Sequence, residues 1–210
     1  MAIVASFQAE SSVLIDMASR IRPDADVITL DTGRLPQQTY DMIDRVRDRY
    51  GIDVQVVSPD AADLQEMVGS HGANLFLRSV EMRRLCCDVR KSRPLARALA
   101  GYDAWVTGLR RQQAPTRAQT AVVAADPEHT GLTKVAPLAS WTHDQVWDYI
   151  RENDLPYHSL YDSGYTSIGC EPCTRATTAG EDERAGRWWW EQNEVKECGL
   201  HWSAPTASAS

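Results

Sequence analysis

Strand-like and helix-like segments alternate through the first 150 residues, and this alternation limits the fold more than any other feature of the sequence. Short apolar runs typical of strands stand at 2–6, 26–30, 53–57, 104–108, 121–124 and 134–138. Helix-like sequence lies between or after them at 9–21, 37–51, 59–69, 87–100 and 140–153. Strands separated by helices predict an α/β fold: an open, mostly parallel, doubly wound sheet with helices on both faces.

Two of the predicted helices carry boundary signals. Pro94 should end or bend the basic helix at 87–100, or mark a first turn. The segment at 140–153 begins with Ser and Thr residues that can cap a helix, and Val146, Trp147 and Ile150 form an apolar stripe along it.

Three polar clusters directly follow predicted strands: Ser6 to Glu10, Asp31 to Arg34, and Gly108 to Arg111. Open α/β sheets bind ligands at the carboxyl ends of their strands, near the point where the strand order reverses. We therefore expect the three clusters to contribute to one shared pocket.

The sequence changes character at Pro156, where short Gly, Pro and Cys turns replace the alternation. A chain of 210 residues fits one domain. We expect residues 1–155 to form the α/β domain, 156–201 to be an active-site extension of the same domain, and 202–210 to be a disordered tail.

Composition excludes several classes of protein. No run approaches the roughly 20 apolar residues of a membrane helix, and the amino terminus carries no secretory signal, so the cytoplasm is the expected location. The net charge of −7 argues against a nucleic-acid or membrane binder. The segment from Arg83 to Arg117, however, contains nine Lys or Arg residues and only two acidic residues, both Asp. This local positive charge indicates an anion site or a solvated basic helix face.

The five cysteines form two tight pairs and one lone residue: Cys86 with Cys87, Cys170 with Cys173, and Cys198. An odd number argues against a disulfide framework. A CxxC pair alone fits a redox pair, half a zinc site or half an iron–sulfur site. Zinc would bring sulfurs within roughly 3.8 Å, which is awkward for adjacent residues whose side chains diverge by about 100° on a helix. Four thiolates therefore favour one 4Fe–4S cluster over zinc or unligated thiols.

Several segments carry a family resemblance. CCDVRK (86–91), SIGCEPCTR (167–175), EDERAGRWWWE (181–191) and KECGLH (196–201) resemble the iron–sulfur class of the assimilatory APS/PAPS reductases. TLDTGRLPQQTY (29–40) and GLRRQQAPTR (108–117) are similar to the same family. The resemblance extends from about Ser6 to His201 and implies an adenine nucleotide alpha hydrolase-like fold, with a nucleotide-binding domain at 1–155 and a cluster-binding, catalytic extension at 156–201.

The resemblance also implies a reaction. The substrate would be adenosine 5′-phosphosulfate (APS), reduced to sulfite with release of AMP in assimilatory sulfate reduction. Cys198 would be the catalytic nucleophile and would carry an S-sulfocysteine intermediate. Thioredoxin or a similar separate dithiol reductant would release sulfite. One 4Fe–4S cluster would be bound by Cys86, Cys87, Cys170 and Cys173, without changing its redox state during turnover.

The remaining site residues are predicted substrate contacts. Lys91 would lie between cluster and substrate, and arginine forks suit the oxyanions of a phosphosulfate. Arg184 and Arg187 could instead pair with the acids at 181–183 on the surface. The full predicted set is Ser6, Leu30, Thr32, Lys91, Gly108, Arg117, Arg184, Arg187 and His201.

Other interpretations stay open. A PAPS reductase would use the 3′-phosphorylated nucleotide, although family members that carry all four cluster cysteines usually prefer APS. A tRNA thiolase of related fold needs a glycine-rich pyrophosphate loop, which SFQAESS at 6–12 resembles poorly. A ferredoxin-like carrier or zinc-stabilised binding module would leave Cys198 unexplained. We also expect the Trp188 to Trp190 run to pack against the cluster region and to offer a docking surface for the reductant, and the chain can form a homo-oligomer.

Overall fold

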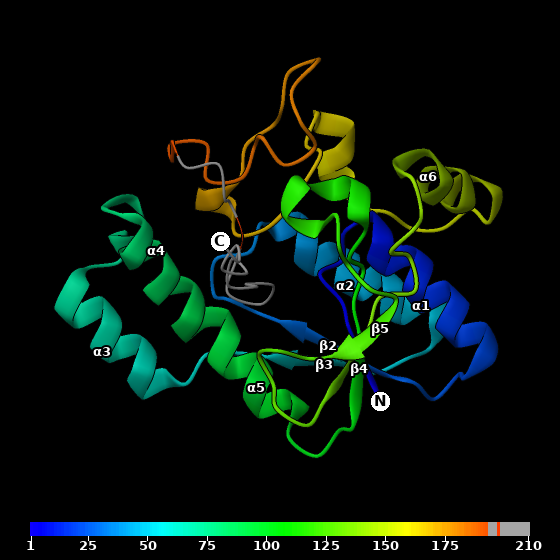
Figure 1. Cartoon of the computed structure of the whole chain (residues 1–210), viewed down its shortest axis with the longest axis horizontal. Helices are drawn as coiled ribbons and strands as arrows, with labels where there is room; N and C mark the ends of the chain where they lie inside the picture. Colours follow the sequence, from blue (N-terminus) through cyan, green and yellow to red (C-terminus); the bar gives the residue numbers. More distant parts are fainter. Residues whose placement is uncertain (193–196, 198–210) are drawn as a thin grey trace, which may run out of the picture.

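The computed structural model describes residues 1–192 and Glu197. A six-stranded sheet with the order β3-β2-β1-β4-β6-β5 forms its centre (Figure 1). All neighbouring strands are parallel except β5, which runs antiparallel to β6 at the edge. The strands are β1 (Ala2–Val4), β2 (Asp26–Leu30), β3 (Val54–Val57), β4 (Ala104–Val106), β5 (Val123–Ala125) and β6 (Thr133–Val135). The predicted α/β fold is confirmed.

Helices cover both faces of the sheet, as a doubly wound fold requires (Figure 1). Ile3 and Val27 pack with α1, α2 and α6 on one face, whereas Ala2 and Ile28 pack with α5 on the other. Successive strand residues therefore point to opposite faces. The α-helices are α1 (Ala9–Ile21), α2 (Gln37–Tyr50), α3 (Ala61–His71), α4 (Val80–Cys87), α5 (Arg93–Leu99) and α6 (His143–Glu152).

The basic helix predicted at 87–100 is wrong in its extent. Helix α4 ends at Cys87, a π-helical turn η2 (Asp88–Ser92) follows, and α5 begins at Arg93. The proline ring of Pro94 provides no N–H and would clash with the carbonyl of Arg90 four residues earlier in a regular helix. A wider turn avoids that clash, and such turns are frequent at functional sites.

Other predicted elements are present with shifted boundaries. Helix α6 begins only at His143, because Thr142 caps it and Gln145 bonds back to the Thr142 N–H. The strands predicted at 121–124 and 134–138 correspond to β5 and β6, with boundaries displaced by one to three residues.

Residues 156–192 form short turns that lie above the sheet, in yellow to orange in Figure 1. They contain 3₁₀ helices η5 (Ser159–Ser163) and η6 (Glu171–Cys173), and a bridge joins Thr174 to Arg187. Further 3₁₀ helices are η1 (Leu75–Leu77), η3 (Arg111–Gln113) and η4 (Pro115–Arg117). No helix in the described part of the chain has the length and apolar character that a bilayer crossing requires.

Candidate active site

A cavity of about 150 Å³ opens at the carboxyl ends of β1, β2 and β4. Ser6, Thr32 and Gly108 each lie two residues beyond the end of one of these strands. The chain winds from β1 through β2 to β3 and then returns to β4 on the other side of β1, so this is the point where the strand order reverses. Eight predicted substrate residues line the cavity: Ser6, Leu30, Thr32, Lys91, Gly108, Arg117, Arg184 and Arg187.

The loop after β1 has an unusual backbone. Phe7 is fully buried and has a φ of 56°, a left-handed conformation that costs energy for a residue other than glycine. The Ser6 N–H donates to Ser11 Oγ at 3.0 Å, and Gln8 Oε1 accepts from the Ile168 N–H at 2.7 Å. Burial and these bonds hold the turn, and the bond to Ile168 attaches it to the carboxy-terminal extension.

Two arginines of the extension reach the cavity through different supports. Arg187 is buried, donates to the Ile168 carbonyl at 3.1 Å and lies over the Trp188 ring at 4.8 Å. Arg184 donates to Glu197 at 3.2 Å. Of the acids at 181–183, Glu181 binds Arg175 and Glu183 binds Arg110. Both arginines line the cavity, where they can bind an anion.

Arg117 reveals a contact that the sequence did not indicate. Its guanidinium binds the buried Glu197 carboxylate through Nε and Nη2, both at 2.8 Å. The partners are 80 residues apart in the chain, and in the sequence Glu197 stands out only as part of ECGLH. No sequence pattern of Arg117 distinguishes a substrate ligand from an ion-pair partner.

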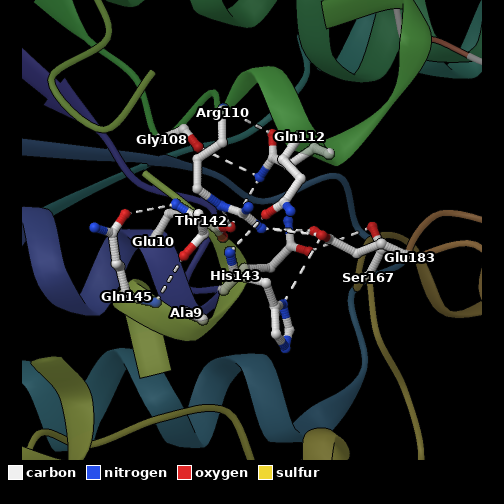
Figure 2. Close-up of polar contacts among 12 residues, drawn as sticks. Ala9, Glu10, Gly108, Arg110, Gln112, Thr142, His143, Gln145, Ser167 and Glu183 are labelled. Carbon is white, nitrogen blue, oxygen red and sulfur yellow. Dashed lines mark hydrogen bonds and ion pairs between the residues drawn. The ribbon is translucent and has the colours of Figure 1, made fainter. Parts of the chain in front are cut away.

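A second buried network, made of ion pairs and hydrogen bonds around Arg110, lies beside the cavity (Figure 2). Arg110 donates from Nε to Glu10 at 2.7 Å and from Nη2 to both oxygens of Glu183 at 2.9 and 3.0 Å. Gln113 also donates to Glu10, at 2.9 Å. A side chain at Gly108 would place its Cβ 2.7 Å from the Cβ of Glu10, so only glycine allows this approach. One guanidinium thereby joins α1, the loop after β4 and the extension.

The two cysteine pairs meet beside the first cavity. Cys86 and Cys87 end α4, Cys170 directly precedes η6 and Cys173 ends it. All four are buried and line one small second cavity. Arg34, Arg83, Arg90 and Lys91 line the same space. Lys91, on the π turn, lines both cavities. Lys91 thus borders both spaces, and its charge lowers the pKa of Cys170.

Electrostatics differ among these thiols. Burial and the neighbouring Cys170 and Cys87 raise the pKa of Cys173 to about 12. Burial alone would also raise the pKa of Cys170, but Lys91 and a 3.2 Å contact with Thr32 Oγ1 bring this pKa below its usual value. Ionising all four of these buried thiols would require nearby positive charge.

The donor set suits a multi-iron cluster in number and chemistry. No disulfide joins the four cysteines described here. Within residues 1–192 and Glu197, no three His, Cys, Asp or Glu side chains lie close enough together to share a single metal ion. Four thiols around one cavity with adjacent cations match the four-thiolate, anionic character of a 4Fe–4S site. Whether the cluster is present stays a prediction.

Two predicted residues, Cys198 and His201, lie outside the described residues, as does the predicted tail at 202–210. The tryptophan run divides as its sequence suggests: Trp188 is buried beside Cys86, Cys170 and Cys173, whereas Trp189 is exposed. Trp190 is partly buried and packs against the same cluster, so the predicted packing of the run against the cysteines applies to Trp188 and Trp190. The use of the run as a docking surface is untested.

Known proteins with similar sequence and structure agree with one another. Residues 1–176 match the family model of the phosphoadenosine phosphosulfate reductase domain. An adenosine 5′-phosphosulfate reductase of Allochromatium vinosum is 48% identical over 196 residues, covering 93% of this chain and 76% of the relative. One of Burkholderia cepacia is 51% identical over 175 residues, covering 83% and 70%. The crystal structure of phosphoadenylyl-sulfate reductase from Candida auris, a phosphate complex, has a TM-score of 0.70 at 31% identity, covering 83% of this chain and 82% of that one.

Proposed function

The chain belongs to the phosphoadenosine phosphosulfate reductase domain family, and from this premise we propose that it reduces adenosine 5′-phosphosulfate to sulfite and AMP in sulfate assimilation. The observation that carries the proposal is the cavity at the strand ends. It combines Leu30, Thr32 and Gly108, which suit a nucleoside, with the cations Lys91, Arg184 and Arg187. Relatives of about 50% identity that are named APS reductases support the unphosphorylated nucleotide.

The chemistry requires a thiolate to attack an anion. The Cys198 thiolate attacks the sulfur of the phosphosulfate, the S–O bond to phosphate breaks, and AMP leaves with the bonding electrons. Lys91, Arg184 and Arg187 lower the repulsion between the thiolate and the sulfonyl and phosphate oxygens. The product on the enzyme is S-sulfocysteine.

A dithiol reductant of the thioredoxin kind completes the cycle. One of its thiolates attacks the Cys198 sulfur and expels sulfite, forming a mixed disulfide. Its second thiolate then displaces Cys198, so the reductant is oxidised to a disulfide and the enzyme thiol is regenerated. The two electrons that reduce the sulfur thus come from the dithiol.

The four remaining cysteines have a separate role in this proposal. Cys86, Cys87, Cys170 and Cys173 would hold one 4Fe–4S cluster, whose charge supports the electrostatic setting of Lys91. In this arrangement residues 1–155 bind the nucleotide, and residues 156–201 contribute cluster ligands and the nucleophile. We also propose a cytoplasmic location, where reduced thiols persist, and self-association into a homo-oligomer.

Mass spectrometry tests the proposal directly. Anaerobically purified protein mixed with APS, without reductant, should gain one SO₃ group, which peptide mapping should place on Cys198. Cys198→Ser should gain none and should form no sulfite with thioredoxin present. Turnover should be faster on APS than on PAPS. A wild-type protein that gains no SO₃ from either nucleotide would overturn the proposed function, and faster turnover on PAPS would overturn the substrate.

A further inference from the structure

The carboxylate of Glu197 sits in a receptor formed by two arginines and a threonine. Its Oε1 accepts hydrogen bonds from Arg117 Nε at 2.8 Å and Thr116 Oγ1 at 2.9 Å. Its Oε2 accepts from Arg117 Nη2 at 2.8 Å and from Arg184 Nη2 at 3.2 Å. Arg117 therefore binds both oxygens at once, the geometry that makes arginine–carboxylate pairs strong and directional.

The main chain of Glu197 is fixed as well. Its carbonyl oxygen accepts a hydrogen bond from Arg83 Nη1 at 3.0 Å. Arg83 is fully buried, forms an ion pair with Glu191 and lies over the Trp188 ring at 4.4 Å. Three separate parts of the chain, at 83, 116–117 and 184, thus hold this one residue.

Burial of the Glu197 carboxylate requires compensating interactions. The Glu197 side chain is only 3% exposed, and an ionised carboxylate is costly to bury unless it is paired. Burial alone would raise its pKa, but Arg117, Arg184 and Thr116 keep this pKa below the usual value. The site therefore holds a charged carboxylate, which gives the contact a single defined geometry.

The residues that bind the Glu197 carboxylate lie at the substrate cavity. Arg117 and Arg184 both line the substrate cavity, and Cys198 follows Glu197 directly in the sequence. Consecutive Cα atoms in a chain are about 3.8 Å apart. Cys198 is joined by a single peptide bond to the residue that these contacts hold.

Resting on the function proposed above, we infer that Glu197 is a positioning residue for Cys198 and that Arg117 serves as its receptor instead of binding the substrate. The two contacts of Glu197 with its arginines differ in strength. Arg117 donates two bonds at 2.8 Å, whereas Arg184 donates one at 3.2 Å. Arg184 can thus turn to the phosphosulfate while Arg117 keeps Glu197 in place.

Glu197→Gln and Arg117→Gln test this role. With saturating APS and no reductant, both variants should transfer SO₃ to Cys198 at least about tenfold more slowly, because a charge-assisted hydrogen bond is worth roughly tenfold or more. The affinity for AMP, measured by calorimetry, should stay at the wild-type value. The double variant should be no slower than the slower single variant, since both changes remove the same contact.

The position of Cys198 can also be measured without substrate. Alkylation of Cys198 by iodoacetamide, followed by peptide mapping, should be faster in Glu197→Gln than in the wild type. Glu181→Gln is the matched control, because Glu181 lies on the same extension but pairs with Arg175 away from the cavity. It should keep wild-type transfer and alkylation rates, and circular dichroism should show that all variants are folded.

These experiments distinguish a failure of the positioning role from a failure of the proposed function. Equal transfer and alkylation rates in the wild type and Glu197→Gln would overturn the positioning role. Weaker AMP binding in Arg117→Gln would show that Arg117 is a direct ligand and would overturn its assignment as receptor. A wild type that acquires no SO₃ would instead contradict the proposed function, and the alkylation rates would still decide whether Glu197 anchors Cys198.

Discussion

Gly169 is the residue whose missing side chain leaves space for the Arg187 guanidinium. A Cβ at this position would come within 2.7 Å of three guanidinium atoms of Arg187. Both residues line the substrate cavity. The glycine is required here by a close approach of another side chain, not by its own backbone angles.

Gly169→Ala should therefore displace Arg187 and weaken catalysis. Loss of a charge-assisted hydrogen bond corresponds to about 10- to 100-fold in kcat/KM for APS. Steady-state kinetics with a thioredoxin system would measure it. Gly69→Ala in α3 is the matched control, because a Cβ added there would meet nothing within 4 Å outside its own helix. It should leave kinetics unchanged and stabilise the helix by up to about 1 kcal/mol, whereas equal kinetics in both variants would contradict the role of Gly169.

His158 is a buried neutral histidine that should make stability depend on pH. It contacts Thr39 Oγ1 through Nε2 at 2.9 Å and accepts the Leu160 N–H at Nδ1 at 3.3 Å. Burial lowers its pKa from 6.5 to about 4, partly opposed by Asp41. The folded state therefore takes up a proton less readily than the unfolded state between these two pH values.

The sign of the effect follows from this difference. Above about pH 6.5 the histidine is neutral in both states and contributes no pH dependence. As the pH falls toward 4, the unfolded state gains a proton first, so stability falls by roughly 3 kcal/mol in total. Urea unfolding at several pH values, with His158→Gln as reference, would measure this contribution. An identical pH dependence in both proteins would refute it.

Among the elements, the loop after β4 depends on Arg110. This side chain is 1% exposed and pairs with Glu10 and Glu183, which belong to α1 and to the extension (Figure 2). Arg110→Leu would leave two carboxylates without their shared counterion. Removing one partner of a buried ion pair typically costs about 3–5 kcal/mol.

Urea denaturation of Arg110→Leu should show a loss of that order. Arg111→Leu is the adjacent control, since Arg111 is exposed and donates only from Nε to the Thr120 carbonyl among the contacts described. Its cost should stay within about 1 kcal/mol. If the two variants lost equal stability, the buried network would not be what holds the loop.

The elements also show which features a single sequence can predict. Apolar runs and caps are local, so the six strands and helices α1, α2, α3 and α6 followed from the pattern, whereas α4 was not predicted. A Ser or Thr cap was expected for α6, and Thr142 is that cap. The π turn could not be predicted, because Pro94 indicated that the helix is interrupted but not which kind of turn interrupts it. The pairs Arg110–Glu10 and Arg117–Glu197 span 100 and 80 residues and leave no periodic signal. Motif resemblance and position at strand ends were enough to predict the eight cavity residues.

At the scale of the whole molecule, the second cavity, which the four cysteines line, connects two regions that are distant in sequence. Cys86 and Cys87 belong to the helix that precedes the π turn and α5, whereas Cys170 and Cys173 belong to the extension. Cys86, Cys170 and Cys173 share one apolar cluster with Met67, Phe76 and Trp188. If a 4Fe–4S cluster is bound here, it ties the extension to the α/β layers by four metal–thiolate bonds.

Removing one ligand should therefore loosen the extension more than the sheet. Cys87→Ser, purified anaerobically, should contain well below the roughly four irons per chain of a complete cluster. Its melting temperature should fall, and limited proteolysis should cut within 156–192 before it cuts the sheet, because the extension lies above the sheet as short turns (Figure 1).

Cys198→Ser provides the matched comparison, because it removes a cysteine from the same chain without touching the four that line the cavity. It should keep the iron content, melting temperature and protease resistance of the wild type while losing sulfite production. Iron loss in Cys198→Ser as large as in Cys87→Ser would place the lone cysteine among the structural ligands. The proposed separation of four structural sulfurs from one reactive sulfur would then be wrong.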